Sequence, residues 1–529
     1  MPVSVPTDTR LSFGLLDWLI IAFYLAMLVA IGCYFSRRQR TLKDYFLAGK
    51  HMSWLPIGLS LMAALNSGID YLTQPSAFLK YGLVIIVVNL SWLLLYPYAF
   101  FVTMPLYRRL DVYSAYEYLQ NRFSVTVRCL ASGIFILWRL GWMATALYVP
   151  CLAFHTATAG RLPLKPTILV LGAVATLYTM LGGVKAVIWT EVIQFVVMFG
   201  GLLLTMIIIF AKVPIDLGNL LASAGQGGAG RGAAATVPSG FYGQLIEVFR
   251  QPVTWYGVLI AALVGRLAGY TSDQIMVQRF QTSRTIRDLR QGFLITAISD
   301  IVWMTTLIFV GVTLYLFFRG KALPAWVASN TDYYFPYFMS VVFPPGATGP
   351  VIAAIIAASL SAIASAINSQ STVIVVDFYN CLIRKRKRPI EDLGERERRF
   401  QMRLSRCAAL AAGLAGTLLS CQLDRLGTLF EIGNKVIQTF TGPLLAIFWL
   451  GMFTRRANSL SAFLGGLVGT AVGIYVAFFS SLSFLWPSTF AFVSALAIGY
   501  VVGWFRPITE SARQWNWFTI TKRALVETS

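Results

Sequence analysis

The sequence predicts an all-α polytopic membrane protein with about 13 transmembrane helices. Of its 529 residues, 57% are hydrophobic and only 12% are charged, and the mean hydropathy is +0.68. This composition lies well outside that of most soluble proteins. Apolar runs recur along almost the whole chain, each near or above the roughly 18–20 residues that cross a bilayer. We therefore expect the helix bundle itself to form the core, without a separate soluble domain.

The apolar runs predict the spans in order. The first run has no small-residue cleavage site after it, so we expect a retained span rather than a signal peptide. The predicted spans cover residues 15–35, 53–78, 82–106, 126–157, 166–184, 187–211, 250–272, 292–318, 348–380, 404–422, 430–453, 459–480 and 484–505. The aromatic stretch between the eighth and ninth spans, residues 330–350, is expected to cap the outer end of the bundle.

The net charge of +21 is explained by the positive-inside rule rather than by a nucleic-acid ligand. The basic residues cluster between spans that would all open on one face, whereas residues 217–240 are poor in lysine and arginine. We expect a multi-pass protein of the cell (inner or plasma) membrane, with its N-terminus outside and its C-terminus cytoplasmic. The basic clusters include "SRRQRTLKDYFLAGK", "VQRFQTSRTIRDLRQ" and "RKRKRPIEDLGERERRFQMR".

Two spans carry signs of interruption. The second span contains "SLMAALNSGIDYLTQPSAF", where an apolar helix is broken by Asn66, Ser67, Gly68 and Asp70. The seventh reads "LIAALVGRLAGYTSDQ", with glycines at 265 and 269 and a polar end. Paired broken helices at matching places in two halves indicate an inverted-repeat transporter with a binding site near mid-membrane. The alternative is a glycine-kinked span whose polar residues are buried in packing.

Metal and enzyme chemistry find little support in the residue pattern. The six cysteines have no CxxC spacing, and the two histidines, His51 and His155, lie far apart. No nucleophile–base set or metal-ligand spacing is apparent. We expect neither an enzyme nor an organic cofactor.

Six motifs follow one another along the chain: "DYFLAGKHMSWLPIGLSLMA", "SAYEYLQNRF", "YTMLGGVKAVIWTEVIQ", "SDQIMVQRF", "SLSAIASAINSQSTVIVVDFY" and "GPLLAIFWLGMFTRRA". In this order they resemble the sodium:solute symporter family, which includes sodium/glucose, proline and monocarboxylate cotransporters. The similarity runs from about residue 40 to 505. The resemblance implies a five-plus-five inverted-repeat core, the leucine-transporter-like fold, with alternating access driven by sodium.

With that fold, the chain divides into six parts. They are an outer N-terminus with the first span and a basic inner loop (1–52), a first inverted repeat of five spans (53–211), an external Gly/Ala-rich loop (212–249), a second repeat of five spans (250–453), two peripheral spans (454–505) and a cytoplasmic tail (506–529).

The resemblance also implies a sodium site, built from carbonyls at the first broken helix and from carbonyl and hydroxyl groups on the ninth span. Sodium is a hard cation and, like other hard cations, prefers oxygen ligands. Ser361 offers a hydroxyl, whereas Ala362 stands where the family usually has serine or threonine, so Asn66 or a water would have to fill the gap. Taken alone, Ser361 could instead bond to its own helix. The matching positions are Ala63, Asn66, Ala358, Ser361 and Ala362.

A second sodium site, used by some family members, would involve Glu191 and Ser365, although Ala364 lacks the expected hydroxyl. An acid at the inner end of its span could equally be solvated.

The solute pocket of sugar-carrying members matches Asp70, Gly269, Tyr270, Asp300 and Lys435 here. A sugar pocket would thus have become two acids and a lysine. Ionisable groups inside a membrane are costly and are functional candidates by default. A structural salt bridge between Asp70 and Lys435 is the alternative.

The sequence therefore predicts a cation-coupled symporter, with sodium as the coupling ion, that imports a small polar solute: a sugar, polyol, sugar acid or zwitterion. A proton-coupled or sodium-independent transporter of the same fold, or a non-transporting solute sensor, remains the alternative. The expected partners are the solute and the lipid bilayer, and no nucleic acid.

Overall fold

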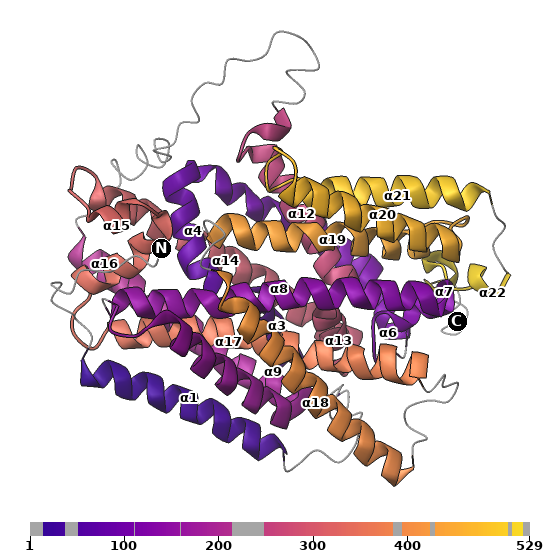
Figure 1. Cartoon of the computed structure of the whole chain (residues 1–529), viewed down its shortest axis with the longest axis horizontal. Coiled ribbons are helices and arrows are strands. Elements are labelled where there is room, and N and C mark those ends of the chain that lie inside the picture. The colour runs from indigo at the N-terminus through magenta and orange to yellow at the C-terminus, as the bar shows by residue number, and fades with distance from the viewer. Residues whose placement is uncertain are drawn as a thin grey trace, which may run out of the picture.

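Helices make up every regular element in the part of the chain that the structure, a computed structural model, describes (Figure 1). This agrees with the predicted all-α class. The described residues are 14–36, 51–110, 112–158, 160–213, 248–383, 394–423, 429–505 and 510–521. Most of the predicted Gly/Ala-rich loop, part of the basic stretch after residue 383 and the end of the tail lie outside them.

The helices follow the chain in two sets. The first set is α1 (Leu15–Ser36), α3 (Trp54–Leu65), α4 (Gly68–Tyr81), the 3₁₀-helix η2 (Gly82–Leu90), α5 (Ser91–Tyr98), the π-helix η3 (Ala99–Thr103), α6 (Met104–Arg109), α7 (Glu117–Arg122), α8 (Val125–Ala157) and α9 (Leu164–Lys212). The second set is α12 (Trp255–Ser272), α13 (Gln274–Thr282), α14 (Ile286–Phe318), α15 (Ala325–Ala328), η4 (Thr331–Tyr333), α16 (Tyr334–Val342), α17 (Thr348–Val373), η5 (Ile374–Ile383), α18 (Glu395–Ser420), α19 (Leu429–Phe453), α20 (Ser459–Phe478), α21 (Pro487–Trp504) and α22 (Glu510–Arg513).

Ten helical stretches among the described residues are long and apolar enough to cross a membrane. One of them, residues 68–109, joins the end of the second predicted span to the third. The other predicted spans fall on α3, which has only 12 residues, on α12, and on α18, whose first turns are charged. The prediction of a multi-pass membrane protein is therefore confirmed.

The first break separates α3 from α4. Asn66 (φ −101°, ψ 150°) and Ser67 (φ −136°, ψ 172°) are extended, and Gly68 then starts the new helix. A Cβ at Gly68 would lie 2.5 Å from the carbonyl oxygen of Ile355 in α17. Only glycine lets the broken segment approach α17 this closely, which brings the break against the central helix of the bundle.

The second break differs in position from the one expected. Gly265 and Gly269 lie inside the continuous helix α12, and the chain breaks instead at Asp273 (φ −81°, ψ 119°). The Asp273 side chain accepts a hydrogen bond of 2.9 Å from the backbone N–H of Ile275 and so caps α13. The break therefore comes from a capping acid rather than from glycine flexibility.

A third interruption lies within α9, where Gly183 has φ 58° and ψ −174°. Residues with a side chain rarely adopt a positive φ. The kink divides α9 into the stretches 164–181 and 183–212, which agree with two of the predicted spans.

The most buried of the long helices is α17, in which every residue from 351 to 373 is buried. Its many alanine and serine residues allow neighbouring helices to approach closely, as small residues do in membrane bundles. It packs against α8 and α9, while α20 and α21 lie side by side against α19 on another flank (Figure 1). The expected aromatic cap forms η4 and α16, which cover the end of the bundle beside α4.

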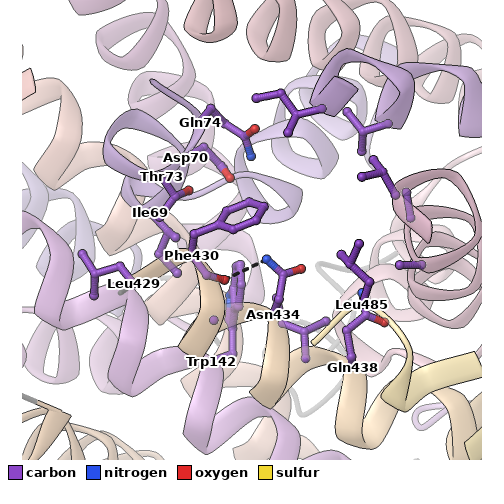
Figure 2. A pocket seen from close by; sticks show the side chains of 17 residues that line it. Ile69, Asp70, Thr73, Gln74, Trp142, Leu429, Phe430, Asn434, Gln438 and Leu485 are labelled. Carbon is purple, nitrogen blue, oxygen red and sulfur yellow. Dashed lines mark hydrogen bonds between the residues drawn. The ribbon is translucent and has the colours of Figure 1, made fainter. Parts of the chain in front are cut away.

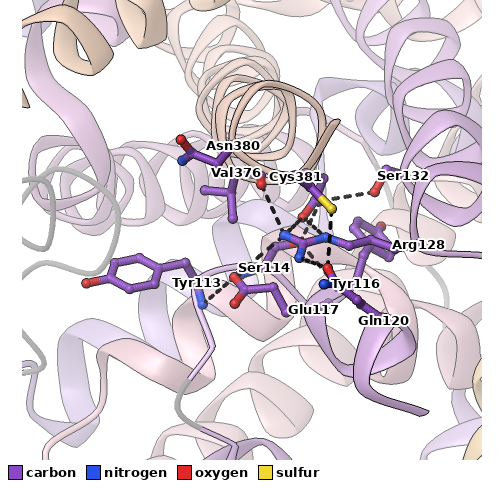
Figure 3. A network of polar contacts seen from close by, with 12 residues as sticks. Tyr113, Ser114, Tyr116, Glu117, Gln120, Arg128, Ser132, Val376, Asn380 and Cys381 are labelled. Carbon is purple, nitrogen blue, oxygen red and sulfur yellow. Dashed lines mark hydrogen bonds and ion pairs between the residues drawn. The ribbon is translucent and has the colours of Figure 1, made fainter. Parts of the chain in front are cut away.

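A polar network fastens the beginning of α8 to η5 (Figure 3). Asp377 accepts hydrogen bonds from Arg128 Nε at 2.8 Å, Ser114 Oγ at 2.7 Å and Ser132 Oγ at 3.0 Å. Arg128 also donates to Gln120 Oε1 at 2.6 Å. Because each carboxylate oxygen and guanidinium nitrogen has a partner, this buried pair holds the end of α17 at a fixed position on α8.

Candidate cation and solute sites

Three oxygen atoms meet where the first break touches α17. The Ser361 hydroxyl lies 2.8 Å from the carbonyl oxygen of Ala63 and 2.7 Å from that of Ala358. All three residues are buried. Carbonyl and hydroxyl oxygens are suitable ligands for a hard cation, and these belong to two elements that the cation would join.

The Ala63 carbonyl is available because of the break. In a continuous helix it would accept the N–H of Ser67, four residues later. Here that N–H donates instead to Asp70 Oδ2 at 2.9 Å. The carbonyl therefore points to the Ser361 hydroxyl rather than into its own helix.

The two other residues predicted for the cation site contribute differently. Ala362 is buried and brings no side-chain oxygen. The Asn66 side chain turns towards α14, where its Nδ2 donates to Asp300 Oδ1 at 2.8 Å. The structure thus brings Ala63, Ala358 and Ser361 together. The Asn66 side chain instead belongs to a neighbouring group of polar side chains around Asp300.

Asp300 is enclosed by the side chains of Asn66, Trp92 and Arg266 and does not line a cavity that the structure describes. Its Oδ2 accepts a hydrogen bond of 2.7 Å from Trp92 Nε1 and forms an ion pair of 2.7 Å with Arg266. Arg266 also lies over the Trp92 ring, 4.7 Å from its centroid. Asp300 is fully buried, so its charge is neutralised by Arg266. This arrangement favours a structural role over the predicted contact with solute.

The residues predicted for a second cation site, Glu191 and Ser365, do lie together. The Ser365 hydroxyl donates directly to Glu191, and the guanidinium of Arg279 contacts both residues: it pairs with Glu191 and donates to Ser365 Oγ at 2.6 Å. Its Nε donates to Ser60 Oγ at 2.8 Å. The Arg279 side chain already supplies the positive charge at this acid, so the geometry gives no support to a second sodium ion there.

A cavity of about 160 Å³ lies beside the first break (Figure 2). Asp70 lines it from α4 and is the one ionisable group among the described residues that line it. Polar groups also come from Thr73, Gln74, Asn434 and Gln438. The remaining lining residues are the aromatic Trp142 and Phe430 together with Ile69, Ile85, Val88, Val258, Ala261, Ala262, Leu429, Gly433, Ile437 and Leu485. An apolar wall with a few convergent polar groups is typical of a small-molecule site.

The other residues predicted for the solute site are not among those that line this cavity. Gly269 lies within α12, and Tyr270 is fully buried against Phe293, with ring centroids 4.9 Å apart. Lys435 forms no ion pair with Asp70 in the structure, which gives no support to the alternative of a structural salt bridge between them.

The lining residues of α19 sit on a different face from Lys435. Residues 430, 433, 434, 437 and 438 repeat with helical spacing and face the cavity, whereas position 435 is turned away by about 140° at 100° per residue. Counting back from Pro443 led to the helix that lines the cavity, but Lys435 lies on another face of that helix. The periodicity of "FEIGNKVIQ" would have selected Asn434 and Gln438.

Comparison with known proteins agrees with this geometry. The model of the sodium:solute symporter family matches residues 45–469. The chain is 27% identical over 508 residues to the sodium/sialic acid symporter SiaT of Proteus mirabilis, covering 95% of this chain and 97% of the relative. It is 30% identical over 475 residues to the sodium-dependent multivitamin transporter of Oryctolagus cuniculus, covering 88% of this chain and 70% of the relative.

Among solved structures, the fold resembles a substrate-bound, outward-open Na⁺-coupled sialic acid symporter. The TM-score is 0.80 at 26% identity, with coverage of 93% of this chain and 98% of the other. The nucleobase–cation symporter Mhp1 shares the fold alone, with a TM-score of 0.61 at 13% identity and coverage of 89% and 97%. The chain belongs to the sodium:solute symporter family and is therefore a sodium-coupled symporter of a small organic solute, not an enzyme.

Proposed function

We propose that the solute is a neutral or zwitterionic polar molecule, such as a sugar, a polyol or an amine-bearing zwitterion, held against Asp70. The supporting observation is that one ionisable residue occurs among the described residues lining the cavity beside the first break, and that residue is an acid. A carboxylate accepts hydrogen bonds from hydroxyl and ammonium groups strongly. It would repel an anionic solute unless a cation accompanied it.

The polar side chains opposite Asp70 support the same class of solute. Gln438 is buried, and its Oε1 has no hydrogen-bond partner. The Asn434 amide donates to the carbonyl oxygen of Phe430 at 2.8 Å, which orients it at the cavity (Figure 2). A buried acceptor without a partner costs about 1–3 kcal/mol, and a solute hydroxyl or ammonium group would relieve this cost.

A sugar acid is the second candidate, because two relatives are named as sodium/sialic acid symporters. The two classes differ in charge. A sugar acid in this cavity would require a positively charged group near its carboxylate, and the part of the lining that the structure describes contains none.

The proposed mechanism is coupled binding followed by alternating access. Sodium at Ala63, Ala358 and Ser361 would join the broken helix to α17, next to the cavity lined by Asp70. A cation that stabilises this arrangement increases affinity for the solute, and the solute must increase affinity for the cation by the same factor.

Uptake and exchange by purified protein in proteoliposomes test this function. Neutral sugars, polyols and zwitterions should exchange by counterflow in sodium and not in choline at the same pH, with sugar acids weaker. Exchange that depends on a pH gradient and not on sodium would indicate proton coupling. Thermal stabilisation by a solute without any counterflow would indicate a sensor.

The lining of the cavity is tested by two neighbouring variants of α19. Gln438→Ala should raise the KM for solute about tenfold, because a hydrogen bond to the solute is lost. Lys435→Gln is the matched control on the same helix and should leave the KM within about twofold. The opposite ranking would contradict this assignment of the cavity.

A further inference from the structure

We propose that Asp70 is also a positioning residue for the cation site, and that it couples solute binding to sodium binding through the cap of α4. This inference rests on the proposed function, because it assigns a second task to the carboxylate that would hold the solute. It is carried by the contacts of the first break, where one side chain lies at both sites.

The first step is the cap itself. Asp70 Oδ2 accepts the N–H of Ser67 at 2.9 Å, and Ser67 Oγ accepts the N–H of Ile69 at 3.2 Å. This reciprocal pair is a capping box, which holds the start of a helix in a defined geometry. It fixes Ser67 in the extended conformation that ends α3 and starts α4.

The second step is the consequence for Ala63. The N–H that Asp70 captures is the one that a continuous helix would give to the Ala63 carbonyl. With that donor engaged, the carbonyl is left to the Ser361 hydroxyl at 2.8 Å. The acid thus keeps a sodium ligand available without touching it. If the cap were lost, the Ser67 N–H could return to Ala63, and the helix would close across the break.

The third step is the link to the solute. Asp70 lines the cavity with Thr73 and Gln74, one turn further along α4 (Figure 2). A solute that donates to the carboxylate would hold its side chain in the capping rotamer. Fixing the cap fixes the Ala63 carbonyl, so the solute and the ion would each strengthen the other's site.

Two substitutions at Asp70 separate the cap from the charge. Asp70→Asn keeps an oxygen that can accept the Ser67 N–H, since asparagine caps helices about as well as aspartate. Asp70→Leu has similar size and no acceptor. Asp332→Leu is the matched control, because Asp332 is also buried and its Oδ2 accepts a backbone N–H, that of Leu429, at 2.9 Å.

The measurement is thermal stabilisation of the purified full-length protein by sodium, titrated without solute. We expect the half-saturating sodium concentration to stay within about threefold of wild type in Asp70→Asn and Asp332→Leu, and to rise at least tenfold in Asp70→Leu. Solute stabilisation at saturating sodium should be lost in both Asp70 variants.

Two results would overturn the inference. One is an unchanged sodium titration in Asp70→Leu. The other is an equal loss in Asp70→Asn and Asp70→Leu, which would assign the effect to charge and not to the cap. A solute outside the proposed class would refute the proposed function alone, because the sodium titration contains no solute.

Discussion

Replacing Ser361 with alanine should weaken the dependence of uptake on sodium by about tenfold or more. The hydroxyl is the one side-chain oxygen that the described structure places at the cation site, 2.8 Å from the Ala63 carbonyl and 2.7 Å from that of Ala358. Its removal leaves two carbonyl ligands and a buried methyl group. The site would then have to recruit water in a region where the neighbouring residues are fully buried.

The magnitude follows from the cost of a missing polar contact. Leaving a buried partner unsatisfied costs about 1–3 kcal/mol. At about 1.4 kcal/mol for each factor of ten, this corresponds to a rise of roughly 5- to 150-fold in half-saturating sodium. Ala362→Ser should act in the opposite direction, because it adds an oxygen where the present chain has none.

The assay is initial uptake into proteoliposomes as a function of sodium, with solute saturating and pH fixed. Ser371→Ala is a suitable control, since Ser371 lies on the same helix and donates a buried hydrogen bond of 2.8 Å to the carbonyl oxygen of Ser405. It loses a comparable bond away from the site, so its sodium dependence should match that of wild type.

The reasoning fails if Ser361→Ala and Ser371→Ala show the same sodium dependence. It also fails if wild-type uptake persists unchanged in sodium-free buffer, in which case a proton on a buried acid becomes the better coupling ion.

Three further predictions concern other parts of the molecule. Asp300→Asn should lower the thermal stability in detergent, because it leaves the buried guanidinium of Arg266 without its counter-charge at a cost of about 3–5 kcal/mol, whereas the double variant Asp300→Asn/Arg266→Met should recover part of that loss, since the amide oxygen can still accept from Asn66 and Trp92. Burial raises the pKa of Glu117 to about 6, so folding favours its protonated form and wild type should gain stability relative to Glu117→Gln as pH falls from 7 to 5. Cysteine labelling of intact cells should mark residues 217–240 and leave 384–406 unmodified; the reverse pattern would contradict the predicted topology.

The sequence was sufficient for the fold class and for the first break. Long apolar runs predict membrane-spanning helices because their length matches the thickness of the bilayer. The stretch "NSGIDY" predicts the first break because it places helix-capping residues inside an apolar span. The meeting of Ala63, Ala358 and Ser361 was predictable too, because their backbone and short side-chain oxygens have positions that follow from their helices; sodium binding at these oxygens stays a prediction.

The partners of long side chains could not be predicted in the same way. Asp300 was expected to face solute, but Arg266 and Trp92 enclose it. Lys435 was expected to face Asp70, but it is Gln438, three residues further along the same helix, that lines the cavity together with Asp70. Both differences have the same cause: position in the sequence determines the helix, whereas rotation about its axis and the choice of ion-pair partner depend on tertiary packing.

The ion pair between Arg279 and Glu191 has a consequence for the highest ratio of internal to external solute that the protein can maintain. If Arg279 permanently neutralises that acid, we expect one sodium ion to cross with each neutral solute, so a cycle moves one elementary charge. A membrane potential of 100 mV then contributes about 2.3 kcal/mol, and a tenfold sodium gradient adds about 1.4 kcal/mol. Together they limit accumulation to roughly 500-fold. A second sodium ion in place of the arginine would square that ratio, so we expect this one side chain to set the accumulation limit.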